Sequence, residues 1–264
     1  MTDLTPRIQQ AYFRNGPEHR SGADVSFLDI VKLFGFQSVK VGRWVSASEQ
    51  QLAANLFFDA LCDLMQLLQV PPQVISLKQS LSLQFGIGGQ PGSCAFYQPQ
   101  GRILALAKNA GGGSLAHEWF HAFDHYVARH LFQSAVTEHA FASEQWLSQA
   151  LVRPHPVNLA LDAGFQALFL SEDGAGPSDY VTRCARFDKQ HGIYYYAKPQ
   201  ELAARAFEHL LQRQSLKNSF LVSGTLKSET AKAGLYPDAA LTRQLSTHWF
   251  DYFRLLGQSL QYSL

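Results

Sequence analysis

The stretch that most constrains the fold is LAHEWFHAFDH, residues 115–125, which follows directly on a run of glycines. Its apolar and aromatic residues recur at helical spacing and Ser114 is a suitable N-cap, so we expect a helix from Ser114 through Phe132. His117 and His121 are four residues apart, so on a helix both side chains project from one face, one turn apart. The alternative is an aromatic core helix that carries its histidines by coincidence.

Two imidazoles placed in this way can hold one metal ion, with Glu118 on the neighbouring flank of the helix. This geometry suits a zinc hydrolase, because the carboxylate can take a proton from the attacking water without being a metal ligand. A catalytic zinc site needs a third protein ligand and an open position. One known arrangement has a histidine six residues beyond His121, but Val127 stands there. The third ligand must therefore come from elsewhere in the chain.

Two places offer a third ligand or support for one. Asp124 follows His121 by three residues on the same helix face, which suits a carboxylate that orients a ligand better than one that reaches the ion. The later segment PQELAARAFEHLLQ predicts a helix with Glu201 and Glu208 two turns apart on one face. A buried carboxylate is costly unless it is paired or metal-bound, so either glutamate is a candidate ligand. The alternative is that both face solvent and Glu201 pairs with Arg205.

The pattern along the rest of the chain predicts an α+β fold, in which a small mixed sheet packs on the motif helix and a mainly helical half follows. Ser46 and Glu49 form a capping box for an amphipathic helix that ends at the Pro71-Pro72 pair. The segment that follows predicts strands and turns, with RILALAK as the strand that leads into the glycine run. A hairpin-like section is expected around residues 39–45.

We expect two parts of the chain to form one continuous domain. Residues 1–70 are an N-terminal element with the amphipathic helix, and residues 71–264 contain the motif helix and the helices after it. Four segments with helical spacing follow the motif helix, and a last helix is expected over residues 238–258. The glycine-rich GIGGQPG lacks the Lys-Ser/Thr ending of a phosphate-binding loop, so we interpret it as a turn.

Composition and charge exclude several classes of protein. The formal net charge is +1 and basic residues do not cluster, so neither nucleic acid nor a membrane is an expected partner. Cys62, Cys94 and Cys184 are widely spaced without a C-x-x-C pair, which argues against a disulfide framework or a thiolate zinc site. The sequence has no signal peptide and no run near ~20 apolar residues. We therefore expect a cytoplasmic protein, although export without a signal is compatible with these observations.

The motif and the later helix together resemble the gluzincin metallopeptidases, in which HExxH and a later glutamate hold zinc. The resemblance includes the catalytic domain of anthrax lethal factor, whose motif reads HExxHAxD and whose later helix carries the pattern found here as ELAARAF. It implies a zincin-like fold and one Zn²⁺ ion held by His117, His121 and Glu201. It also implies that Tyr194, in YYYAKPQE, stabilises the oxyanion, with Tyr195 and Tyr196 as the alternatives.

A broader likeness, carried by FGFQSVKVGRWV, the motif region, KPQELAARAFE and GLYPD, is to the metallopeptidase-like module of large polyvalent proteins of phages and conjugative elements. A weaker one is to bacterial relatives of calcium-activated chloride channel accessory proteins. These features together predict a zinc-dependent peptidase that acts on a protein or peptide, with Glu118 deprotonating the attacking water. We expect RILALAK to be the edge strand on which an extended substrate pairs. The alternative is a zincin-fold protein that binds or regulates a partner with little turnover.

Overall fold

The computed structural model of the chain describes residues 7–87, 95–107 and 112–261. The backbone divides into two units. The first comprises the chain up to Ala122 together with residues 214–223, and the second comprises residues 123–213 and 224–264. A late segment of the chain therefore completes the N-terminal unit. The expected boundary near residue 70 stays a prediction.

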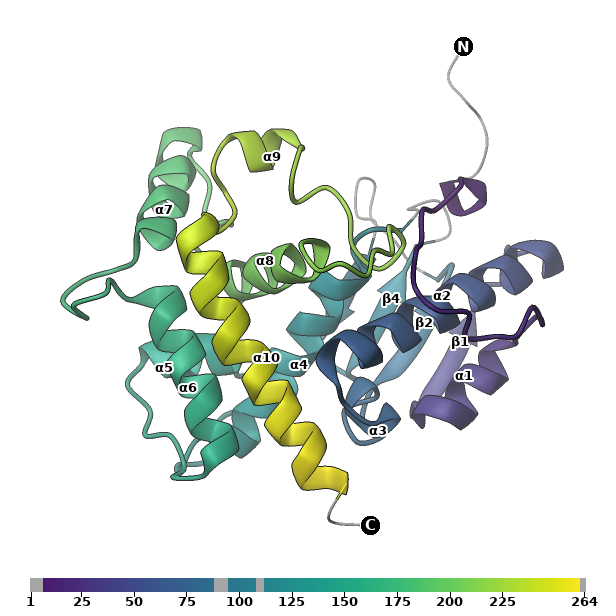
Figure 1. Ribbon diagram of the computed structural model, residues 1–264, viewed down its shortest axis with the longest axis horizontal. Coiled ribbons are helices and arrows are strands. Elements are labelled where there is room, and N and C mark those ends of the chain that lie inside the picture. The colour runs from purple at the N-terminus through teal and green to yellow at the C-terminus, as the bar shows by residue number, and fades with distance from the viewer. Residues whose placement is uncertain (1–6, 88–94, 108–111, 262–264) are drawn as a thin grey trace. The chain divides into compact units, whose positions relative to one another are not determined.

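A four-stranded mixed sheet lies in the first unit, as the sequence predicts (Figure 1). Its strands are β1 (Ser38–Val41), β2 (Ser82–Phe85), β3 (Ala95–Gln98) and β4 (Ile103–Leu106). The spatial order is β1-β2-β4-β3. β1, β2 and β4 run parallel, whereas β3 is antiparallel to β4. The strand predicted from RILALAK is β4, which confirms that part of the sequence analysis.

Two details predicted for this sheet are wrong. The section around residues 39–45 forms no hairpin, because β1 pairs in parallel with β2, with Val39 opposite Leu83. β4 is not an edge strand, because β2 lies on one side of it and β3 on the other. Alternating apolar residues indicate a strand but do not show which strands lie beside it. Parallel neighbours are especially hard to predict, because a long connection separates them in the sequence. The edge strand beside β4 is β3.

The described part of the chain begins with a short 3₁₀ turn, η1 (Arg7–Gln9), and the helix α1 (Phe27–Phe34), which precedes β1. The helices α2 (Ala47–Leu68) and α3 (Pro72–Ile75) lie between β1 and β2 in the sequence. The predicted capping box of α2 is confirmed, since the Ser46 N–H donates to Glu49 Oε2 at 2.8 Å. α1 was not predicted, although Ser26 and Asp29 form the same kind of box at its start. The S-x-x-D pattern before an apolar run is the signal that could have found it.

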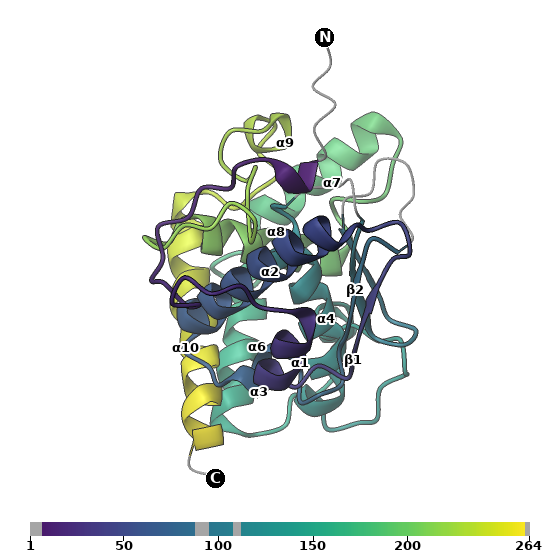
Figure 2. The same ribbon diagram turned by 90° about the vertical axis from the view of Figure 1, so that its right-hand side faces the viewer.

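An aromatic cluster holds α1 and α2 against one face of the sheet, where Figure 2 shows both helices beside β1 and β2. Phe27 of α1 and Phe57 of α2 both contact Phe85 of β2, with ring centroids 6.1 and 6.2 Å apart. Phe220, from the late segment of this unit, lies 5.4 Å from Phe57. Burial of rings this large is a main source of stability for such a core. The segment 214–223 is therefore part of the core of the first unit.

Helices make up the second unit, as the sequence predicts for the C-terminal half. They include α5 (Ala142–Leu147), α6 (Pro156–Phe169), α7 (Asp179–His191), α8 (Pro199–Gln212), α9 (Glu229–Lys232) and α10 (Ala239–Gln261). α10 extends the last predicted helix by a few residues. Both views show α10 running alongside α6 (Figures 1 and 2). Phe207 of α8 adds its ring to this layer, 6.3 Å from Trp249 of α10.

The close approach of α6 and α10 depends on Gly164. A Cβ atom at this position would lie 2.3 Å from Cδ1 of the buried Trp249 ring. We therefore expect Gly164→Ala to lower the free energy of unfolding by about 1–3 kcal/mol, as overpacking of a core does. Chemical denaturation measures this loss. Gly176→Ala is the control, because a Cβ there meets nothing within 4 Å; an equal loss in both variants would show that the crossing is not responsible.

Two expectations drawn from composition are also addressed by the structure. Cys62 and Cys184 are buried free cysteines, and burial raises the pKa of their thiols to about 12 and about 11. Both thiols are therefore protonated at neutral pH and behave as small apolar groups. Cys94 lies outside the described residues, as does most of GIGGQPG. Among the helices that the structure describes, none has the length and apolar character needed to span a membrane.

Candidate metal centre

The motif helix α4 (Leu115–Leu131) begins where the sequence predicts, and two glycines set its start. Gly113 adopts a left-handed φ of +103°, and a Cβ on it would lie 2.1 Å from Ser223 Oγ. A Cβ on Gly112 would lie 2.5 Å from the ring of Phe220. Gly112 and Gly113 are therefore needed because residues 220–223 pass so close to the helix start.

This segment also pairs with the backbone at the start of α4. Gly113 N–H donates to Phe220 O at 2.7 Å, and Ala116 N–H donates to Leu221 O at 3.0 Å. The first amide groups of a helix have no partner within the helix, so an outside carbonyl is needed for them. The residue so held, Ala116, immediately precedes His117.

His117 and His121 lie as predicted on one face of α4, and both are buried, with 8% and 7% of their surface exposed. Their Nε2 atoms are 3.1 Å apart and their rings are nearly perpendicular, at 81°. Two nitrogen ligands at about 2.0–2.1 Å from a tetrahedral zinc ion are separated by roughly 3.3–3.4 Å. The two imidazoles thus present ligand atoms almost at the spacing that one zinc ion requires.

Glu118 is fixed by a contact that the sequence did not reveal. Its Oε2 accepts a hydrogen bond from the backbone N–H of Tyr97 in β3, at 2.8 Å. Because β3 is the edge strand of the sheet, the carboxylate next to the histidine pair is tied to that edge. One flank of α4 therefore carries the histidines and the neighbouring flank meets backbone of an extended strand.

Glu201 lies in the first turn of α8, a helix that begins at Pro199. Its side chain is half-buried. With His117 and His121 it makes a group of three residues that could hold a metal ion, each offering one ligand atom. Two imidazole nitrogens and one carboxylate oxygen are a donor set found in catalytic zinc sites, which leave a further position for water or substrate. The residues present could therefore hold a single metal ion.

Glu208, the other candidate ligand, does not face solvent. It is buried, with 5% of its surface exposed, and its Oε1 accepts a hydrogen bond from Tyr236 Oη at 3.1 Å. Arg205 is buried as well, with its guanidinium 4.1 Å above the ring of Tyr236 and its Nε donating to Leu235 O. The alternative in which both glutamates lie on a solvated face is therefore wrong for Glu208. The hydroxyl of Tyr236 is hydrogen-bonded to the Glu208 carboxylate.

The three candidate tyrosines precede α8 in a loop that one buried carboxylate fixes. Asp188, near the end of α7, accepts hydrogen bonds from the backbone N–H groups of Tyr195, Tyr196 and Ala197, at 2.9, 3.2 and 2.9 Å. Only 3% of Asp188 is exposed. Sequence reasoning missed this residue, because Asp188 carries no motif and its partners are backbone groups.

The loop distinguishes among the three tyrosines. Tyr196 is packed, with its ring 5.2 Å from that of Phe187 and 4.9 Å from the Arg205 guanidinium. Tyr194 and Tyr195 are 67% and 42% exposed. A hydroxyl that reaches a substrate must be accessible to it, so this arrangement favours Tyr194 or Tyr195 over Tyr196. The choice of Tyr194 stays a prediction.

Asp124 is fully buried, and both its carboxylate oxygens accept hydrogen bonds from Ser143, one from the backbone N–H at 2.8 Å and one from Oγ at 2.5 Å. It thus caps the first turn of α5. That it also orients a metal ligand stays a prediction.

His125 and His209, which the sequence analysis assigns no role, have other contacts. His125 lies 2.6 Å from the carbonyl of Glu138, and burial lowers the pKa of His209.

Comparison with known proteins connects the C-terminal part of this α+β chain with one family. A model described as large polyvalent protein-associated domain 1 matches residues 187–260. The matched segment includes Tyr194 and Glu201, whereas His117 and His121 lie outside it. The match supports the predicted link to large polyvalent proteins. No curated protein and no solved structure matches the chain.

Proposed function

We propose that this protein is a zinc-dependent peptidase of the gluzincin type that acts on a protein or peptide. The observation that carries the proposal is the pair of buried imidazoles on α4, with Nε2 atoms 3.1 Å apart and Glu118 on the neighbouring flank. Glu201 is the proposed third ligand, supported by its membership of the group of three residues that could hold a metal ion.

A zinc ion bound there would lower the pKa of a water molecule toward ~7 and polarise the scissile carbonyl. The other steps fall to the chain's own side chains. Glu118 accepts the proton of the attacking water and returns it to the departing amine, as a positioned carboxylate can. Tyr194 donates its hydroxyl proton in a hydrogen bond to the oxyanion. His117, His121 and Glu201 would hold the metal ion.

The edge on which an extended substrate pairs is proposed to be β3, in place of β4. An extended peptide adds to a sheet at an edge strand, whereas a central strand already has a neighbouring strand on each side, as β4 does. The bond from Tyr97 N–H to Glu118 links β3 directly to the proposed proton acceptor. A peptide lying along β3 therefore has its backbone next to that carboxylate.

The direct test of the proposal is the zinc content of the purified protein. We expect about one zinc ion per chain in wild type. We expect almost none in His121→Ala, because the two remaining protein ligands bind zinc too weakly to retain it through purification. Elemental analysis of the two proteins measures this. His139→Ala is the matched control, since His139 is an exposed loop residue.

Two outcomes contradict the proposal. Wild-type protein that takes up far less than one zinc ion per chain would refute the metal site. Zinc retained in full by a folded His121→Ala variant would also refute it. Loss of zinc in His139→Ala to the same extent would show that the change acts through general instability instead of through a ligand.

A further inference from the structure

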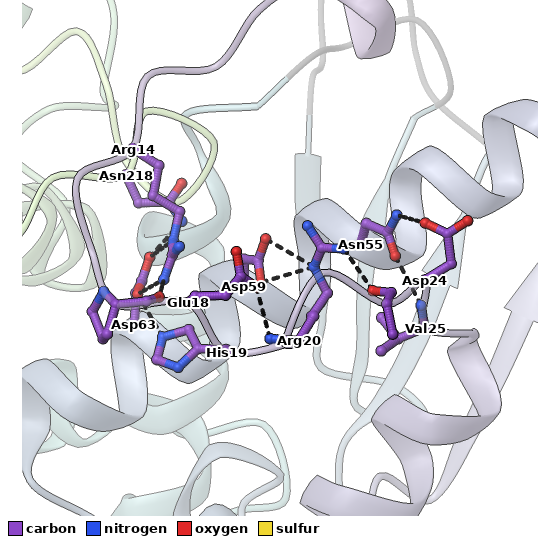
Figure 3. Close-up of polar contacts among 12 residues, drawn as sticks. Arg14, Glu18, His19, Arg20, Asp24, Val25, Asn55, Asp59, Asp63 and Asn218 are labelled. Atoms are coloured by element: carbon purple, nitrogen blue, oxygen red, sulfur yellow. Dashed lines mark hydrogen bonds and ion pairs between the residues drawn. The ribbon is translucent and has the colours of Figure 1, made fainter.

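A polar stripe on α2 holds an N-terminal strap, defined here as residues 10–25. The stripe consists of Gln51, Asn55, Asp59 and Asp63, which follow one another at four-residue intervals and so lie along one face of the helix. The strap follows this face with its own polar groups (Figure 3). Four successive turns of α2 therefore each hold a part of the strap.

The first three contacts fix the strap near its C-terminal end. Gln51 Nε2 donates to Val25 O at 2.7 Å, and Val25 N–H donates to Asn55 Oδ1 at 2.9 Å. Arg20 Nε lies 3.1 Å from both carboxylate oxygens of Asp59. These contacts are partly exposed, so each stabilises the strap only modestly.

The fourth contact, at Asp63, is different because this carboxylate is fully buried. Arg14 donates to it twice, from Nε at 2.6 Å and from Nη2 at 2.7 Å, and His19 Nε2 lies 2.8 Å from Oδ1. Gly16 passes so close that a Cβ there would lie 2.7 Å from Oδ1. A buried carboxylate that loses its partner is strongly unfavourable, so Asp63 requires the strap to stay in place.

Asp63 also accepts a hydrogen bond from the late segment of the chain. Asn218 Nδ2 donates to Asp63 Oδ2 at 2.8 Å, and Asn218 is itself 95% buried, with 5% exposed. The Asn218 Oδ1 atom accepts the backbone N–H groups of Phe220 and Leu221, both at 3.0 Å. The amide of one side chain therefore links the buried carboxylate to the backbone of residues 220 and 221.

Those two residues supply the carbonyls that pair with the start of α4. Phe220 O and Leu221 O accept from Gly113 and Ala116. The strap makes a second, independent contact with the same region, since Gly112 N–H donates to Tyr12 Oη at 2.8 Å. A continuous series of hydrogen bonds thus runs from Arg14 through Asp63 and Asn218 to the residue before His117.

We propose that the N-terminal strap positions the metal-binding helix, with Arg14, Asp63 and Asn218 as positioning residues that set zinc affinity from outside the metal centre. The inference rests on the proposed function, because it assumes that α4 holds zinc. Its physical basis is that the first turn of α4 is fixed by carbonyls whose own position depends on Asn218. A ligand that is less well held binds metal more weakly, and groups that orient ligands typically contribute about 10–100-fold in affinity.

The test compares three variants by zinc affinity, measured in competition with a chromophoric chelator. We expect Asp63→Asn and Arg14→Gln to weaken zinc binding by about 10-fold or more, the scale typical of groups that orient ligands. Arg20→Gln is the matched control, because it removes a cation from the same strap and the same face of α2 but lies outside the path to Asn218. For it we expect less than about a twofold change.

A second measurement tests, in the absence of zinc, whether the strap holds the start of α4 in place. Amide hydrogen exchange of Gly113 and Ala116 in the metal-free protein should become faster in Arg14→Gln than in Arg20→Gln, because their carbonyl partners are less well held. Arg14→Lys, which keeps the charge and loses the two-pronged contact, serves where a harsher change prevents folding. It should give an intermediate effect.

The outcomes separate this inference from the proposed function. Wild type that binds no zinc refutes the proposed function, while the exchange rates still decide whether the strap holds α4. Wild type that binds zinc with unchanged affinity in folded Arg14→Gln and Arg14→Lys overturns the positioning role and leaves the proposed function intact. An equal loss of affinity in Arg20→Gln would also overturn it, because the effect would then reflect strap stability alone.

Discussion

Replacement of Glu118 by glutamine is expected to abolish peptide hydrolysis while zinc remains bound. Proton transfer by a positioned side chain contributes about 10²–10⁴-fold to a rate, so we expect the loss to lie in this range or above it. Glutamine keeps an oxygen that can accept the N–H of Tyr97, which now lies 2.8 Å from Glu118 Oε2. The loss therefore reports on proton transfer more than on a displaced side chain.

The measurement compares protein N-termini in cells that express wild type and Glu118→Gln, since new N-termini specific to wild type identify the substrates. Zinc content of both proteins is measured in parallel. Glu144→Gln, which neutralises an exposed carboxylate on α5, is the control and should behave as wild type. Identical N-termini together with an unchanged phenotype in Glu118→Gln would contradict the peptidase proposal and favour a protein that binds or regulates a partner.

The second large effect is expected for the third zinc ligand. Loss of a residue that only supports a ligand typically costs 10–100-fold in metal affinity, so loss of the ligand Glu201 should cost more than about 100-fold. We therefore expect Glu201→Gln to lose zinc. Glu208→Gln should retain it, because Glu208 is engaged by the hydroxyl of Tyr236 and the amide can still accept that bond.

Competition with a chelator measures both affinities, and far-UV circular dichroism shows that each variant folds. Glu208 is the stringent comparison, because both glutamates lie on α8 and Glu208 is the more buried of the two. If Glu208→Gln loses zinc while Glu201→Gln keeps it, the ligand assignment is wrong although a metal site with the two histidines survives. Retention of zinc by both variants would place the third ligand elsewhere.

The parts of the fold that the sequence predicts well are those fixed by local geometry. A four-residue spacing places His117 and His121 on one helix face wherever that helix lies, and their close approach follows from it. The capping box at Ser46 is equally local. Ser26 and Asp29 form the same kind of local box at the start of α1, so the start of this helix also carries a local signal in the sequence.

The parts that could not be predicted depend on partners far along the chain. The residues of β4 indicate a strand, but whether it is central or at an edge depends on where β2 and β3 lie. Glu118 is 21 residues from its partner Tyr97, and Asp63 is 155 residues from Asn218. No periodicity joins such residues, because a single hydrogen bond leaves no repeating pattern in the sequence. The contacts that position the candidate site are thus the ones that pattern reasoning misses.

The first unit is built from two separate stretches of the chain, and this affects its folding during synthesis on the ribosome. Its late segment, residues 214–223, follows Ala122 only after residues 123–213 have been made. At roughly 5–20 residues per second, that interval lasts about 5–20 s. During this time Asp63 is without Asn218, and the first turn of α4 is without the carbonyls of Phe220 and Leu221. The hydrogen bonds that hold the helix of the histidine pair therefore form late in synthesis, after most of the helices have been made.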